Sequence, residues 1–286
     1  MTAKKFVATP IFALMNTVVT KISFSFPKKR GDYLVFSLPQ TNHYQNIINL
    51  AITPSGCKKT ADKCWGNKIV ILTLNDVKKE VKIDFQIKLK PYSVTINKNY
   101  KITNYSKNVF SPNRFINGQD QKIVKIAKGV VGKERNLETI IKNLYLFTRN
   151  YLTYGKPTAG LYSYKQAIEE RMTDCGGFST FLASLLQTVN IPSRLVVGFL
   201  IKKDWVSRIL TFNFSLLTFN FLKIHAWLEV MLPNKSWFPI DASTSKFGQI
   251  PANRLVTSFG CDFNIKINNS NYQIDLLQKP VYLSKN

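Results

Sequence analysis

Three residues in the C-terminal half are of the types that act together in nucleophilic catalysis: Cys175, His225 and Asp241. A cysteine thiolate attacks carbonyl carbons, a histidine takes the thiol proton, and a carboxylate fixes the orientation and tautomer of the imidazole. The choice of base is narrow because the chain has two histidines, His43 and His225. His225 is the better placed, because Asp241 follows it in the next predicted strand. Together the three residues supply a nucleophile, a base and a group that orients the base.

Cys175 precedes a stretch that is predicted to be an amphipathic helix. Apolar residues recur at helical spacing from Phe178 onward, and Pro192 ends the pattern. Cys175 is therefore expected at the helix N-terminus, where unpaired N–H groups and the helix dipole lower a thiol pKa. Gly176 and Gly177 are expected to leave room for a substrate backbone. The alternative is a buried structural cysteine beside a flexible turn.

His225 begins a predicted strand in which polar or aromatic residues alternate with apolar ones. This alternation places His225, Trp227 and Glu229 on one face, which is typical of a cleft wall. Glu229 could contact substrate or a cationic neighbour, and a hydrogen bond to an adjacent loop is the favoured interpretation. A second strand that ends at Asp241 follows a tight turn at Pro233. We therefore expect Asp241 to lie beside His225.

The first 112 residues are predicted to form antiparallel strands. Alternating or β-branched runs at 33–38, 68–74 and 81–87 are separated by turn residues at short intervals. Cys57 and Cys64 lie in a loop between strands, where they could form a small disulfide or remain two buried thiols. They do not indicate a zinc site, because no second Cys/His pair accompanies them.

A polar stretch at 106–121 separates this part from a region of predicted helices. One helix is expected to end at Gly132 and the next to begin after Asn136 as its N-cap. The predicted fold class is α+β. An N-terminal antiparallel β-sandwich-like domain, residues 1–112, is followed by a catalytic domain, residues 113–286, in which helices pack on an antiparallel sheet.

Three further stretches have a strand or arm pattern. Residues 209–222 alternate as a hairpin or bulged strand that either packs on the core, which is favoured, or binds an apolar partner, and residues 263–276 predict a hairpin. Residues 6–19 are apolar but interrupted, which favours a leading arm over a secretory signal. No stretch has about 20 uninterrupted apolar residues, so no transmembrane helix is predicted. The compartment stays open, with the cytoplasm slightly favoured over export.

The composition is that of a folded, basic protein. Of 286 residues 45% are hydrophobic, which excludes a mainly disordered chain, and four cysteines are too few for a disulfide scaffold. The net charge is +24, but the lysines and arginines are scattered and no nucleic-acid motif accompanies them. Specific nucleic-acid binding is therefore not predicted, and non-specific binding of polyanions stays open.

Three sequence blocks give the chain a resemblance to the transglutaminase-like superfamily of papain-related cysteine enzymes. The first is DCGG at 174–177, continued through NIPSRLVVG at 190–198, and the others are HAWLEV at 225–230 and WFPIDAS at 237–243. The resemblance covers roughly 119–245, and the N-terminal strands, with DKCWGN at 62–67, look like the β domain that often precedes this core. One departure is Ala242, where many members have proline, and this alters a turn and leaves the carboxylate in place.

The resemblance implies that Cys175 attacks an amide or peptide carbonyl and forms a thioester acyl-enzyme, that His225 moves the proton and that Asp241 orients His225. Transamidation, deamidation and peptide hydrolysis all follow from such a triad, and hydrolysis is favoured because nothing specifies an amine acceptor. The backbone N–H of Cys175 is the expected oxyanion donor, and Trp227 is expected to be a cleft wall. No cofactor or metal is predicted, because no acidic loop has calcium-binding spacing. The expected partner is a protein or peptide substrate, and the alternative is a catalytically idle binding module.

Overall fold

In sequence order, the helices lie between an N-terminal and a C-terminal group of strands. A computed structural model describes residues 18–102, 111–158, 160–201, 210–213 and 222–284. The helices are α1 (Gln121–Val131), α2 (Leu137–Tyr151), α3 (Tyr164–Glu170) and α4 (Cys175–Thr188), with a 3₁₀ turn at Leu74–Asp76. The strands are β1 (Val18–Pro27), β2 (Tyr33–Ser37), β3 (Gln45–Thr53), β4 (Lys58–Ala61), β5 (Lys68–Thr73), β6 (Glu80–Leu89), β7 (Tyr92–Ser93), β8 (Thr153–Tyr154), β9 (Met172–Thr173), β10 (Ser193–Ile201), β11 (Leu210–Asn213), β12 (Leu222–Met231), β13 (Trp237–Asp241), β14 (Lys246–Phe247), β15 (Gln249–Ile250), β16 (Arg254–Phe259), β17 (Phe263–Ile267), β18 (Ser270–Ile274) and β19 (Val281–Leu283).

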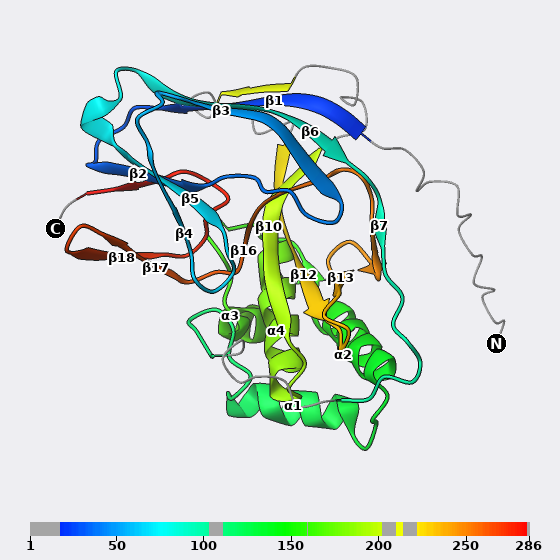
Figure 1. Cartoon of the computed structure of the whole chain (residues 1–286). Coiled ribbons are helices and arrows are strands. Elements are labelled where there is room, and N and C mark those ends of the chain that lie inside the picture. The colour runs from blue at the N-terminus through cyan, green and yellow to red at the C-terminus, as the bar shows by residue number, and fades with distance from the viewer. Residues whose placement is uncertain (1–17, 103–110, 159, 202–209, 214–221, 285–286) are drawn as a thin grey trace.

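Two four-stranded sheets form the predicted β-sandwich. One has the strand order β11-β1-β6-β3 and the other β19-β2-β5-β4. Aromatic residues from both sheets share one core, among them Phe24 of β1, Phe36 of β2 and Phe85 of β6. Figure 1 shows the N-terminal strands of these sheets, coloured blue to cyan, at the end of the molecule away from the helices. The α+β fold class is confirmed.

Strand β2 is buried along its whole length because it is covered on both faces. Phe36 points into the sandwich core, whereas Val35 packs with Ile265 of the β17–β18 hairpin. The predicted hairpin is found, but its register differs from the one expected. A loop at 268–271 would place Phe263 opposite Leu276, whereas Phe263 pairs with Ile274. The strands are joined by Asn268, which has a positive φ of 54°, and Asn269.

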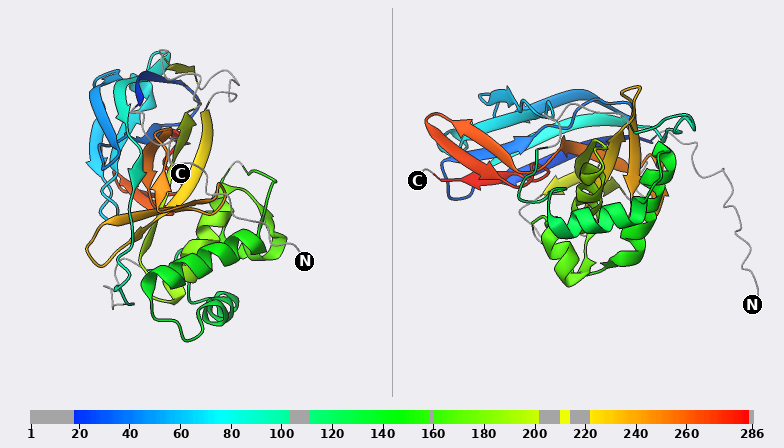
Figure 2. Two further views of the ribbon diagram at one scale, coloured as in Figure 1. Left: turned by 90° about the vertical axis from the view of Figure 1, so that its right-hand side faces the viewer. Right: turned by 90° about the horizontal axis from the view of Figure 1, so that it is seen from below.

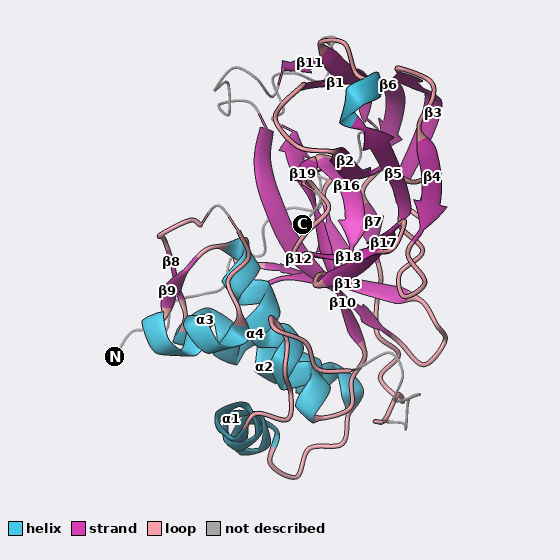
Figure 3. Cartoon of the chain, turned by 90° about the vertical axis from the view of Figure 1, so that its left-hand side faces the viewer, coloured by secondary structure: helices cyan, strands magenta, loops and turns pink. Residues whose placement is uncertain are grey.

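A five-stranded sheet with the order β14-β13-β12-β10-β16 connects the sandwich to the helices. Strand β10 contributes residues to both hydrophobic cores. Its C-terminal Phe199 and Ile201 belong to the sandwich core, whereas Leu195 and Val197 pack in the core that the helices share. Figures 2 and 3 show the helices gathered at the opposite end from the two sandwich sheets.

Helix α4 is the central helix of that second core. Residues 175–186 are all buried, because α1, α2 and α3 surround the helix and β10 and β12 cover its remaining side. A helix covered on all sides must be apolar or small all round, which explains its run of Gly, Ser, Thr, Phe and Leu. The two helix caps predicted for the preceding helices are confirmed. Gly132 is the C-cap of α1, and the Asn136 side chain caps the N-terminus of α2 by accepting the N–H of Thr139 at 3.0 Å.

Two strands from the C-terminal part complete the N-terminal sheets. Strand β11 pairs in parallel with β1, and β19 pairs antiparallel with β2. The domain boundary between residues 112 and 113 stays a prediction. Within the apolar stretch 209–222, a strand is found at 210–213, and residues 214–221 lie outside the described residues, as do residues 6–17. Among the helices that are described, none is long and apolar enough to span a membrane.

Candidate active site

Cys175 is the first residue of α4, as the sequence predicted. Asp174 is the N-cap, and its Oδ1 accepts the backbone N–H groups of Gly176 at 2.9 Å and Gly177 at 3.3 Å. These bonds satisfy two of the N–H groups that a helix leaves unpaired at its N-terminus. The Cys175 side chain is buried but reaches a pocket.

Gly177, in the first turn of α4, allows close packing within the chain. A Cβ on Gly177 would lie 1.9 Å from Oγ1 of Thr173, and one on Gly176 would lie 2.8 Å from Cδ1 of Leu161. The space beside Gly177 is thus filled by the protein itself. The expectation that both glycines make room for a substrate backbone is therefore wrong for Gly177, and Gly176 alone lines the pocket.

The surroundings of Cys175 favour its protonated form. Burial and the neighbouring carboxylate of Asp174 raise the pKa of the thiol to about 12, although the backbone N–H groups of Ala226 and Gly176 act in the opposite direction. The lowered pKa expected from the helix N-terminus is therefore wrong, because burial and the N-cap charge outweigh the N–H groups. The thiol needs a base beside it to become a nucleophile at neutral pH.

His225 lies on β12 opposite Gly198 of β10, and the neighbouring strand β16 leaves no room for a side chain at position 198. A Cβ on Gly198 would lie 1.8 Å from the backbone oxygen of Leu255. The His225 ring is buried, and its Nε2 lies 2.7 Å from Oδ2 of Asp241. Since an ionised carboxylate only accepts, Nε2 carries the hydrogen and Nδ1 is left as the nitrogen that can take a proton.

Asp241, at the end of β13, collects donors on both oxygens. Oδ2 accepts from Thr244 at 2.6 Å and from Nη2 of Arg254 at 2.8 Å, in addition to His225. Oδ1 accepts from Ser243 at 2.7 Å. The side chains of Asp241 and Arg254 are 1% and 3% exposed, so this is a buried ion pair.

This set of donors keeps Asp241 ionised. Burial alone would raise the pKa of its carboxyl, but the hydrogen bond and charge of His225, the charge of Arg254 and the Thr244 hydroxyl hold that pKa well below its usual range. Asp241 therefore remains a carboxylate at neutral and mildly acidic pH. The charge can orient the imidazole and stabilise an imidazolium, which is the role of the third member of a triad.

Trp227 and Glu229 both have structural roles. Trp227 is fully buried beside His225, with ring centroids 6.0 Å apart, so the expected cleft wall is wrong. Glu229 accepts from Nε and Nη2 of Arg194 at 2.8 and 2.6 Å and from the Tyr44 hydroxyl at 2.8 Å. Because Tyr44 lies in the loop before β3, Glu229 has both the expected loop hydrogen bond and a cationic neighbour. Tyr44 ties the strand of His225 to the N-terminal part.

Cys175 and His225 line the same pocket, which has a volume of about 520 Å³. The pocket is lined by Tyr154, Pro157, Thr158, Gly160, Leu161, Asp174, Cys175, Gly176, Val197, Lys223, Ile224, His225, Ala226, Leu276, Gln278 and Lys279. The backbone N–H of Ala226, the residue after His225, lowers the pKa of the Cys175 thiol. The pocket therefore brings a thiol, an imidazole and a space of substrate size to one place.

The remaining histidine and cysteines are elsewhere. His43 stacks on Tyr92, with ring centroids 6.0 Å apart. Cys57, Cys64 and Cys261 are free thiols, and Cys64 is exposed, so neither the disulfide nor the pair of buried thiols expected in the loop is found. Across the described ranges, no three His, Cys, Asp or Glu side chains gather in a way that could hold a metal ion.

Removing the N-cap charge is expected to make Cys175 easier to ionise. Asn at position 174 keeps a side-chain oxygen for capping, so Asp174→Asn changes the unfolding free energy by no more than about 1 kcal/mol. It also removes a charge that raises the thiol pKa, so the pH profile of Cys175 alkylation shifts to lower pH, on the order of one unit. Mass spectrometry of iodoacetamide-treated protein measures the shift.

The matched control is Asp120→Asn, since Asp120 caps α1 in the same way by accepting the N–H of Lys122 at 2.9 Å. This variant should leave the Cys175 profile where it is. An equal shift in both variants, or a shift to higher pH in Asp174→Asn, would contradict the electrostatic role given to Asp174.

Comparison with known proteins agrees with this geometry. Residues 124–242 match the model of the Transglutaminase-like superfamily, and this span contains Cys175, His225 and Asp241. No curated protein matches the chain.

One solved structure shares the fold at low sequence identity, and a second is a weaker match. The structure of "a Putative Cysteine Protease from Cytophaga hutchinsonii" superposes with a TM-score of 0.59 and 15% identity over 86% of this chain and 81% of that one. The periplasmic domain of TgpA from Pseudomonas aeruginosa matches with a TM-score of 0.37 and 13% identity over 82% and 86% of the two chains. The first of these similarities supports the α+β fold over most of the chain.

Proposed function

We propose that the protein, whose residues 124–242 form a transglutaminase-like domain, is a cysteine hydrolase that cleaves amide bonds in peptides or proteins. The observation that carries this proposal is the arrangement in one pocket: Cys175 and His225 both line it, and His225 Nε2 is held 2.7 Å from Asp241. The nucleophile and the base share the pocket, and the orienting carboxylate lies directly behind the base.

In the proposed reaction the thiol proton moves to Nδ1 of His225 while the sulfur forms a bond to the substrate carbonyl carbon. The C–N bond then breaks, and the leaving amine takes the proton from His225. Water attacks the resulting thioester and gives a proton to His225, which returns it to the departing sulfur. The products are a carboxylic acid, an amine and the free thiol.

The negative oxygen that forms during attack needs donors close to Cys175. Among the described residues, no hydrogen bond uses the backbone N–H of Cys175, which is the first N–H of α4. That group points from the positive end of the helix and is the proposed donor.

The charge of the pocket favours water over an amine as the second reactant. Lys223 and Lys279 both line the pocket. A lysine acceptor approaches as an ammonium at neutral pH, so two nearby cations repel it, whereas water is unaffected. We therefore favour hydrolysis over transamidation.

The test is to incubate the protein with a peptide library in H₂¹⁸O, with and without a fluorescent primary amine, and to analyse the products by mass spectrometry. Hydrolysis gives two shorter peptides with ¹⁸O in the new carboxylate. Deamidation gives an intact peptide with a labelled glutamate, and transamidation gives an amine adduct. Products of deamidation or transamidation without cleavage overturn hydrolysis, and no product of any kind favours an idle binding module.

A further inference from the structure

We propose that the Cys175 pocket selects substrates that carry a carboxylate side chain within one or two residues of the scissile amide, and that Lys223 and Lys279 read this charge. The inference rests on the proposed function and specifies its substrate class, an acidic peptide. Lys223 and Lys279 come from different parts of the chain and line the same pocket.

Lys223 is placed by the strand of the proposed base. It lies two residues before His225 on β12, opposite Leu200 of β10. Because side chains at i and i+2 point to the same face, Lys223 and His225 lie on one side of the sheet about 7 Å apart. An extended substrate advances about 3.3 Å per residue, so Lys223 lies opposite a residue one or two positions from the bond to be cleaved.

Lys279 belongs to the segment that leads from β18 to β19. Leu277, two residues earlier, is fully buried, and its backbone oxygen accepts the N–H of Ser37 at 3.4 Å. This anchor keeps the segment against the sandwich while Gln278 and Lys279 line the pocket. Burial lowers the pKa of the Lys279 amine, and a substrate carboxylate would favour its charged form.

The carboxylate in the pocket lining already accepts hydrogen bonds from backbone N–H groups. Among the described lining residues, the single carboxylate is Asp174. Its Oδ1 accepts the N–H groups of Gly176 and Gly177, and its Oδ2 accepts the N–H of Thr158 at 3.2 Å. With two lysines against this one carboxylate, the net charge of the described lining is positive.

The rest of the lining strengthens this selection. Leu161, Val197, Ile224 and Leu276 supply apolar surface around the two lysines. A low local dielectric makes an ion pair stronger than it would be in open water. The +24 net charge of the chain also raises the rate at which acidic peptides arrive.

The test uses three fluorescein-labelled octapeptides of alanine and glycine that differ in one central residue: Glu, Gln or Lys. Their binding to the Cys175→Ala variant is measured by fluorescence anisotropy, so the result does not depend on turnover. We expect the Glu peptide to bind roughly tenfold more tightly than the Gln peptide, since each partly exposed ion pair contributes modestly, and the Lys peptide to bind most weakly. The advantage should shrink as salt is added.

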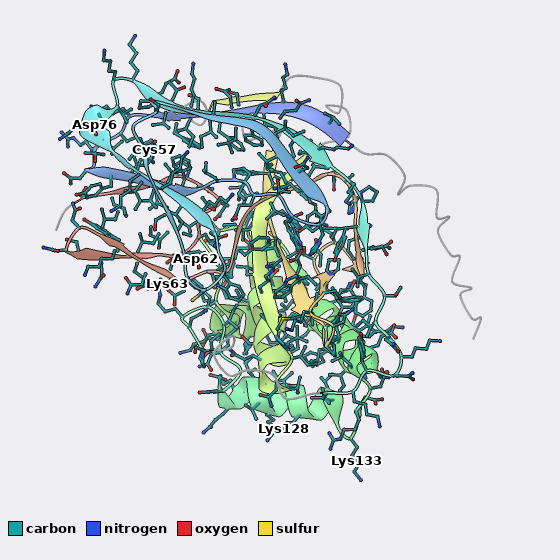
Figure 4. All side chains as sticks on the ribbon, in the orientation of Figure 1. Cys57, Asp62, Lys63, Asp76, Lys128 and Lys133 are labelled. Carbon is teal, nitrogen blue, oxygen red and sulfur yellow. The ribbon has the colours of Figure 1, made fainter. Side chains whose placement is uncertain are left out.

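Lys223→Gln and Lys279→Gln, introduced together into Cys175→Ala, should bring the Glu to Gln affinity ratio close to one. The matched control is Lys133→Gln, an exposed lysine in the turn after α1 that points outward in Figure 4. Equal binding of the Glu and Gln peptides to Cys175→Ala, or an unchanged ratio in the double lysine variant, overturns the inference. Cleavage of the same peptides by the unmodified protein is measured separately, so failure of the proposed hydrolysis is distinguished from failure of the charge selection.

Discussion

Cys175→Ala is expected to abolish amide cleavage, with kcat/KM falling by roughly a million-fold, the scale seen when a hydrolase loses its nucleophile. The physical reason is that no other thiol lines the pocket among the residues the structure describes. The measurement is the rate of product formation on any peptide that the unmodified protein cleaves, followed by mass spectrometry. The thioester adduct on residue 175 should disappear in the same variant.

The matched control for this prediction is Cys261→Ala. Cys261 is also a buried thiol, and burial raises its pKa to about 12, but it lies outside the pocket. This variant should keep native activity if it remains folded, which circular dichroism checks. Residual cleavage in Cys175→Ala within tenfold of the native rate would show that the nucleophile is another group.

Asp241→Asn is expected to lower kcat by about 10⁴-fold while leaving Cys175 in place, because an amide no longer stabilises an imidazolium and permits the wrong tautomer of His225. The variant should also lose stability, about 3 kcal/mol or more, because Arg254 is left as a buried charge without its carboxylate. Steady-state kinetics and urea denaturation measure the two effects on the same preparation.

The double variant Asp241→Asn/Arg254→Met separates the two roles. Removing both charges should restore most of the lost stability, since no unpaired buried cation remains. Activity should stay low, because the imidazolium of His225 still lacks its carboxylate. Recovery of native activity in the double variant would mean that Asp241 serves Arg254 and has no part in orienting the base.

The lowered pKa of Asp241 also makes the stability of the fold depend on pH. Its pKa is held below the value of about 3.9 expected in the unfolded chain, so it stabilises the fold above that pH. This contribution is lost as the pH falls through the lower pKa of the folded state. At neutral pH the carboxylate is therefore fully available to His225.

Local patterns were sufficient to predict much of this site. The helix that begins at Cys175, the strand of His225 and the strand that ends at Asp241 each have a short-range signature, and the structure places each element as expected. Contacts between distant segments were not predicted. Arg254 reaches Asp241 from β16, and Tyr44 reaches Glu229 from the N-terminal part, and neither contact leaves a pattern in neighbouring residues.

The sign of the Cys175 pKa shift shows a second limit of sequence reasoning. The helix N-terminus could be identified from periodicity, and the N–H of Gly176 does lower the pKa of the thiol. How deeply the sulfur is buried depends on how the other helices and strands pack around α4. The periodicity of one helix carries no information about that packing. The pairing of β19 with β2 is missing from the sequence interpretation for the same reason, because it joins the two ends of the chain.

The central claim is that His225 takes the proton of Cys175, and it is tested most directly by the pH dependence of Cys175 alkylation in the native protein and in His225→Ala. Because the pKa of the thiol is about 12, a Cys175 that loses its proton to solvent alone is ionised at pH 7 in roughly one molecule in 10⁵. The account predicts that at pH 7 Cys175 of the native protein reacts with iodoacetamide at least about 100-fold faster than Cys175 of His225→Ala. In the variant, the alkylation rate should rise about tenfold per pH unit up to pH 10. Equal rates and equal pH profiles in the two proteins would contradict it.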